Sequence, residues 1–220
     1  MDKTAVLEAL RGLADPSALQ GMSRFGIDTA NAMGVSMPQL RALGRRIGQD
    51  ANLATELWAS GSREARILAT LIVPKSTVDE GLVMRWLEDV NDWETCDQLC
   101  MNLIRHHPSS LEWAARWADD ERLFVRRAAF ATVAAAAVSM KGVDRDPSFI
   151  SLLELVERHA EDGRPLVRKS MAWAMRSIAR RGDVCRTAVM DACLRMEGSP
   201  SRKISALGYK SRKELEVRYG

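Results

Sequence analysis

Trp93 and Asp97 stand four residues apart in the segment DWETCDQLC. If this segment is helical, both side chains lie on one face, which continues to Met101 and Ile104. A carboxylate in such an apolar setting needs a partner, and the setting raises its pKa unless a cation offsets it. Asp97 is therefore a candidate for a functional carboxylate. Alternatively, it caps a neighbouring helix or pairs with an arginine, and the spacing leaves both interpretations open.

A second pattern alternates cations with an indole in the segment VRKSMAWAMRSIARR. Its members stand at positions i, i+4, i+7 and i+11 of one helical face: Lys169, Trp173, Arg176 and Arg180. The cations of such a stripe can hold phosphates while the ring packs against a sugar or base. A core tryptophan flanked by arginines that reach solvent would give the same pattern.

Basic residues are concentrated in the second half of the chain. Residues 1–110 hold 11 Lys+Arg and 14 Asp+Glu, whereas residues 164–218 hold 14 basic and 5 acidic residues. This asymmetry indicates an anionic partner, most often nucleic acid. A basic, solvated surface without a partner would also produce it.

The composition is that of a soluble globular protein, with 46% hydrophobic and 28% charged residues. No apolar run approaches the roughly 20 residues that span a bilayer, and the N-terminus lacks a signal-peptide core. We therefore expect a cytoplasmic protein with no membrane partner. The four cysteines lack the spacing of a zinc knuckle, so we expect buried thiols, no metal site and no cofactor.

The elements that would position these residues are helices. Helix-favouring Ala and Leu dominate, and no segment alternates apolar and polar residues long enough for a strand. Ser36 is expected to cap a helix that Gly48 ends, and Asp92 to cap a helix that runs to Pro108. These signals predict an all-α fold of about eleven or twelve helices.

One segment echoes another 42 residues later: FVRRAA at 124–129 is followed by LVRKSM at 166–171. A period near 42 is typical of HEAT and armadillo repeats, whose antiparallel helix pairs stack into an α-solenoid. The second helix of each pair lines the concave face, so both basic pairs would lie in a concave basic groove. Since no Pro-, Gly- or Ser-rich linker interrupts the chain, we expect one domain over residues 1–220.

Taken in order, these segments resemble the AlkD-type DNA alkylation repair proteins. The resemblance rests on GVSMPQLRALGRRIG, LWASGSREARILATL, DWETCDQLC, FVRRAAFA and VRKSMAWAMRSIAR, and it extends over about residues 22–219. That family consists of HEAT-like solenoids and includes DNA glycosylases for N3- and N7-alkylated purines. The resemblance implies double-stranded DNA containing alkylated bases as the partner and association with the nucleoid when bound. A solenoid with polar outer helices is expected to be a monomer.

The resemblance also implies roles for individual residues. Asp97 would be the catalytic aspartate, and Trp93 and Trp173 the two indoles that cradle the damaged nucleotide. The DNA contacts would come from Arg127, Arg126, Lys169, Arg176, Arg180 and, on an early helix, Phe25. The chain departs from some relatives at Asp92, where they have an aromatic residue, and some relatives have lost glycosylase activity.

Alkylation at N3 or N7 makes a purine a cationic leaving group, so the barrier lies in an oxocarbenium-like sugar and in delivering water to C1′. One carboxylate can stabilise that charge and position the water. We therefore expect a glycosylase, with Trp93, Asp97 and Trp173 converging on an accessible cleft beside Arg127 and with both indoles partly exposed. The alternatives are a non-catalytic HEAT-repeat protein that binds damaged or structured DNA, and a protein-interaction scaffold.

Overall fold

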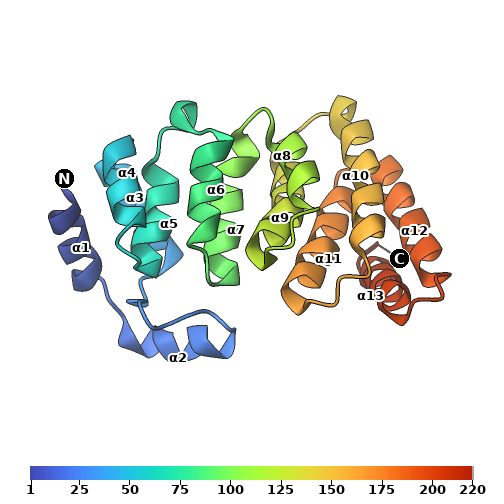
Figure 1. Cartoon of the computed structure of the whole chain (residues 1–220), viewed down its shortest axis with the longest axis horizontal. Helices are drawn as coiled ribbons and strands as arrows, with labels where there is room; N and C mark the ends of the chain where they lie inside the picture. Colours follow the sequence, from blue (N-terminus) through green and yellow to red (C-terminus); the bar gives the residue numbers. More distant parts are fainter. Residues whose placement is uncertain (220) are drawn as a thin grey trace. The chain divides into compact units, whose positions relative to one another are not determined.

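The computed structural model describes residues 1–219 as helices joined by short loops (Figure 1). No strand occurs among these residues, which confirms the expected all-α fold. No helix in this part of the chain is long and apolar enough to cross a membrane. The chain forms two compact units, Met1–His107 and Pro108–Gly220. The expectation of a single domain over residues 1–220 stays a prediction.

The first unit is built around one central helix, α5, which packs against α3, α4 and α7. A pair of indoles connects α4 to α6. Trp58 of α4 stacks on Trp86 of α6 with ring centroids 4.4 Å apart. The elements of this unit are α1 (Lys3–Gly12), α2 (Pro16–Arg24), α3 (Met37–Ile47), α4 (Ala51–Trp58), α5 (Arg63–Ile72), η1 (Lys75–Thr77), α6 (Glu80–Glu88), α7 (Trp93–Asn102) and η2 (Ile104–His106).

Two helix boundaries in this unit follow the sequence signals, and one does not. A capping box between Ser36 and Gln39 begins α3, and Gly48 ends it at a φ of 79°. The expected extension of α7 to Pro108 is wrong, because α7 ends at Asn102. The backbone leaves the helical region at Leu103, where φ is −122° and ψ is −68°, and the next residues form the short turn η2. Ile104 therefore lies in η2 and does not continue the helical face of Trp93 and Asp97.

The second unit consists of three helix pairs. The second helices of these pairs lie side by side, because α11 packs against both α9 and α13 (Figure 1). Among the first helices, α10 packs against α12. The elements of this unit are α8 (Ser110–Trp117), α9 (Leu123–Ser139), η3 (Val143–Arg145), α10 (Asp146–His159), α11 (Pro165–Ala179), α12 (Asp183–Glu197) and α13 (Arg202–Tyr219).

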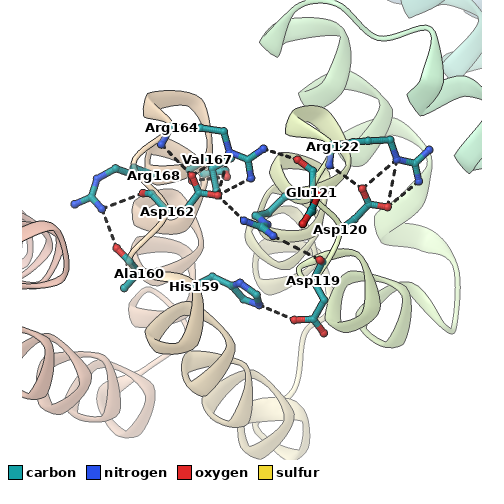
Figure 2. Close-up of polar contacts among 12 residues, drawn as sticks. Asp119, Asp120, Glu121, Arg122, His159, Ala160, Asp162, Arg164, Val167 and Arg168 are labelled. Atoms are coloured by element: carbon teal, nitrogen blue, oxygen red, sulfur yellow. Dashed lines mark hydrogen bonds and ion pairs between the residues drawn. The ribbon is translucent and has the colours of Figure 1, made fainter. Parts of the chain in front are cut away.

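Arginines at the fourth position of α9 and α11 connect successive pairs. Arg126 of α9 lies within reach of the Asp119 carbonyl in the loop before its own helix and donates to Asp162 in the next loop, at 3.5 and 2.8 Å. Arg168 of α11 donates to the carbonyl of Ala160 in its preceding loop and to that of Lys203 in α13, at 2.9 and 2.7 Å. The repeated Val-Arg of the sequence therefore marks a repeated structural contact, of which Figure 2 shows the bond from Arg168 to Ala160.

The loops before α9 and α11 share a second repeated feature, an Asp-x-Arg turn (Figure 2). Asp120 accepts from the backbone and side chain of Arg122, and Asp162 accepts in the same way from Arg164. Arg164 also donates to the Glu121 carbonyl at 2.7 Å and so joins the two turns. Sequence analysis missed this part of the 42-residue repeat, although the letters DER and DGR at the same spacing carry it.

Asp162 is the carboxylate of this network whose pKa is lowered most. Burial acts to raise the pKa of its carboxyl, but hydrogen bonds from Arg164 and Arg126 outweigh it and hold that pKa well below its usual value. A carboxylate with a depressed pKa stabilises the fold above its unfolded-state pKa, near 4, and this stabilisation is lost as the pH falls toward the folded-state pKa.

We therefore expect Asp162→Asn to lower the free energy of unfolding by about 1–3 kcal/mol at pH 7, because two partly buried guanidinium groups lose their charged partner. The difference from the wild type should shrink as the pH falls below about 4, because the Asp162 carboxyl of the unfolded wild type then binds a proton that the folded protein still excludes. Denaturant unfolding at pH 7 and pH 3 measures both effects.

Asp120→Asn is the matched control, because this carboxylate occupies the same turn before α9 but is more exposed and has one arginine partner. Its substitution should cost less. A loss for Asp162→Asn that stays constant between pH 7 and 3 would contradict the proposed role of its charge.

Candidate functional site

The N-terminus of α7 fixes the position of Trp93, the first residue of this helix. Asp92 caps α7 by accepting hydrogen bonds from the backbone N–H groups of Glu94 and Thr95, at 2.8 and 2.9 Å. The Asp92 side chain is buried. The departure from an aromatic residue at this position therefore has a structural reason: the helix that presents Trp93 begins there.

A buried chain of charges attaches the same helix end to α5. Arg63 forms a two-pronged pair with Glu94, at 2.9 and 2.7 Å, and contacts Glu64 at 2.9 Å. Glu64 is fully buried and accepts from the backbone N–H groups of Met33 and Gly34, at 2.9 and 3.0 Å. Each buried charge has an opposite charge or a hydrogen-bond donor, which such burial requires.

Two further hydrogen bonds hold the connection between α2 and α3 (residues 25–36) against the start of α7. Trp93 Nε1 donates to the carbonyl of Phe25 at 2.9 Å, and Asn91 donates to Asp28 at 2.7 Å. Gly34 is required in this connection because its φ is +78° and a Cβ there would lie 2.1 Å from the Asp15 carbonyl oxygen. Phe25 and Trp93, predicted from different parts of the sequence, are therefore neighbours, and the Phe25 ring is exposed.

Asp97 follows Trp93 by one helical turn and is 7% exposed. Trp93 itself is only partly buried, as the sequence analysis expected. The two side chains lie about 6 Å apart along the axis of α7, by the rise of four helical residues. Helix α7 therefore presents a partly exposed indole followed by a buried carboxylate.

A polar pocket beside this helix end is lined by Asp28, Arg63, Asn91, Asp92 and Thr95, among others. Its volume is about 20 Å³, which is close to the space that one water molecule needs. A purine base does not fit in this pocket.

The stripe on α11 faces solvent in the second unit. Lys169 and Arg180 are exposed, and Trp173 and Arg176 are partly buried, while most other residues of α11 are buried. Trp173 is thus not a core residue. Arg176 pairs with Glu214 of α13 at 2.7 Å, so its charge already has a partner within the protein.

Arg126 and Arg127 differ from the stripe because both are engaged in the fold. Arg127 is 4% exposed and donates to the Leu166 carbonyl at the start of α11, at 2.6 Å. Arg126 pairs with Asp162. These contacts give each arginine a structural role, and a role in DNA binding stays a prediction for both.

The predicted site residues fall in two groups, one in each unit. Within the first unit, Phe25 lies beside Trp93, which Asp97 follows by one turn. The convergence of this group with Trp173 and Arg127 stays a prediction. The group of the second unit comprises Arg126, Arg127, Lys169, Trp173, Arg176 and Arg180.

The four cysteines are buried and form no disulfide among residues 1–219, as expected. Burial raises the pKa of Cys185, and it raises that of Cys193 to about 12. Both thiols therefore stay protonated near neutral pH and are poor nucleophiles.

A model of the DNA alkylation repair enzymes matches residues 6–199. The chain belongs to the DNA alkylation repair enzyme family. A comparison with curated proteins finds no match.

Among solved structures, this family member is similar to one described as a new family of proteins related to the HEAT-like repeat DNA glycosylases with affinity for branched DNA structures. The TM-score is 0.79 at 15% identity, over 99% of this chain and 95% of the other. This likeness confirms the HEAT-like repeat solenoid. A designed armadillo repeat protein in complex with the peptide (KR)4 is more distant, with a TM-score of 0.37 at 13% identity over 81% of this chain and 80% of that one.

The hydrogen bond from Trp93 to Phe25 predicts how the α2–α3 connection responds to substitution. Trp93→Phe keeps an aromatic ring but removes the N–H donor, so local opening of this connection should become easier. We expect trypsin to cleave after the exposed Arg24 several-fold faster than in the wild type, with the thermal midpoint little changed. Trp86→Phe, on α6 of the same unit, is the control, and equal acceleration in both variants would contradict a local effect.

Proposed function

We propose that this DNA alkylation repair family member hydrolyses the N-glycosidic bond of cationic N3- or N7-alkylated purines in duplex DNA. The observation that carries the proposal is the partly exposed Trp93 and the buried Asp97, one turn apart on α7. An aspartate is expensive to bury, so a chain that keeps one beside an accessible indole has a reason to do so.

The reaction needs little more than a placed carboxylate. The C1′–N bond breaks and its electron pair neutralises the cationic purine, which leaves without an added proton. The sugar becomes oxocarbenium-like, and a negative charge in a poorly solvated position stabilises it more strongly than the same charge in water. Water then bonds to C1′ and gives up a proton, for which the Asp97 carboxylate is the proposed acceptor.

The indoles would recognise the positive charge of the lesion. A cation over an indole face is attracted by about 0.5–2 kcal/mol, depending on how far it is removed from water. Trp93 in the first unit and Trp173 in the second are both partly exposed, which supports their proposed contact with the nucleotide. Because the pocket near Trp93 has room for about one water molecule, such recognition would use the ring surfaces.

The DNA backbone would be held by exposed cations of the second unit. Lys169 and Arg180 form no ion pair among residues 1–219, whereas Arg176 is paired with Glu214. A phosphate would therefore be the first strong anionic partner of Lys169 and Arg180, but would compete with a carboxylate at Arg176.

A second candidate function is binding of branched DNA without base removal. The structurally similar family described above, which is related to the glycosylases, has affinity for branched DNA. The Trp93–Asp97 pair would then be structural, and the exposed cations would act on the backbone alone.

Asp97→Asn tests the catalytic proposal, because it keeps the shape of the side chain and removes its charge. We expect release of N7-methylguanine from duplex DNA, under single-turnover conditions, to slow by about 10- to 1,000-fold while DNA affinity changes little. Asp92→Asn is the matched control, since asparagine also caps a helix. An unchanged rate in folded Asp97→Asn would contradict the assignment, and no base release by the wild type would favour the branched-DNA candidate.

The ion pair of Arg176 predicts unequal contributions along the α11 stripe. Lys169→Gln and Arg180→Gln should each lower the slope of log K against log salt by about one. Arg176→Gln should change it less, because its charge is already balanced by Glu214. Titrations of fluorescent duplex at several salt concentrations measure the three slopes, and equal slopes in all three variants would contradict this ranking.

A further inference from the structure

The last helix, α13, has an exposed face that the proposed function does not use. Its core side is formed by Leu207, Ser211 and Leu215, which recur at i, i+4 and i+8 and are all buried. The opposite face follows the same helical spacing and is exposed to solvent at Arg202, Ala206, Tyr209, Lys210 and Lys213.

This face is cationic with little internal compensation. Glu216 accepts from Lys213 at 2.9 Å, and Arg212, at the edge of the face, is paired with Glu197 and Glu216. Arg202 and Lys210 form no ion pair among residues 1–219. The ring of Tyr209 is 53% exposed and lies between these two cations in the sequence.

Helix α13 packs against α11 within the same unit. Arg168 contacts the Lys203 carbonyl, and Arg176 contacts Glu214, so α13 runs in the same direction as α11. Tyr209 lies between these two contacts along α13, as Trp173 does along α11. Neighbouring helices lie about 8–10 Å apart, which is a short step along a DNA strand whose phosphates recur every few ångström.

The helix that ends a repeat array must be polar on its outer side to keep the protein soluble. This requirement explains why the exposed face of α13 is charged, but it does not explain why the charge is positive. A mixture of acidic and basic residues would serve that purpose equally well. The exposed residues of α13 are instead mostly cations, on a helix that packs against α11, with the small Ala206 permitting close approach and Tyr209 offering a hydroxyl donor and a ring. Such a surface is complementary to a phosphate backbone.

We propose that the exposed face of α13, centred on Arg202, Tyr209 and Lys210, is a second phosphate-binding surface that holds the same DNA molecule beyond the α11 stripe. The proposal rests on the proposed DNA binding but not on base removal. Its readouts are affinity and salt dependence, so its outcome is independent of whether the protein releases a base.

The test compares three versions of the full chain on one 30-base-pair fluorescent duplex. The α13 variant combines Arg202→Gln with Lys210→Gln. The control combines Arg145→Gln with Arg158→Gln, which removes two exposed cations from η3 and α10 of the same unit. We expect the α13 variant to bind about 5- to 50-fold more weakly at low salt and to lower the salt slope by about two, while the control stays near the wild type.

Adding Lys169→Gln to the α13 variant distinguishes one shared DNA from two separate sites. If both faces hold one molecule, the changes in log Kd should add, because the positions are well separated. Affinity and slope equal to those of the control would overturn the proposal. So would a wild type that binds no DNA, or a change in the sedimentation of the α13 variant with unchanged DNA affinity, which would indicate a protein interface.

Discussion

Successive helix pairs are joined by arginines that donate to backbone carbonyl groups and, at Asp162, to a carboxylate. Arg66, Arg126 and Arg168 each stand at the fourth position of the second helix of a pair. Each lies within reach of the loop before its own helix and of the loop or helix that follows in the next pair. A hydrogen bond from a charged group contributes up to about 1.5–3 kcal/mol, so these contacts help to seat each pair on the next.

Because this position is used by the fold, function has to be sought at the positions beside it. In α9 the next residue, Arg127, is buried and holds the start of α11, whereas in α11 the next residue, Lys169, is exposed. The repeats therefore agree where they bind their neighbours and differ where they meet solvent. Because of this difference, we propose phosphate contacts for the α11 stripe in preference to α9.

The helices and their caps could be predicted from the sequence, but the long-range partners of individual side chains could not. Ser36, Gly48 and Asp92 act within a few residues of their own positions, so local chemistry was enough to place them. No Gly or Pro marks the end of α7 at Asn102, and Asp162 is 36 residues from Arg126. Periodicity assigns a side chain to a face of a helix but does not identify its partner. The sequence therefore predicts Arg126 as a DNA contact and gives no sign of its ion pair with Asp162. The half-buried indoles of Trp93 and Trp173 agree with the sequence interpretation.

The architecture of the first unit constrains how a lesion could be recognised. The pocket beside Trp93 has a volume of about 20 Å³ and is lined by polar groups already bonded to one another. Enlarging it for a base would separate Arg63 from Glu94 and uncap α7, and both changes would displace Trp93 itself. An enclosing pocket at this place is therefore incompatible with the indole that it would serve. A lesion recognised by its positive charge would need no such enclosure, because an indole face attracts a cation at the surface and the Asp97 carboxylate, one turn away, would act on the charge over a short distance. The rigid seating of α7 is then the means of keeping that face and that carboxylate in a fixed relation.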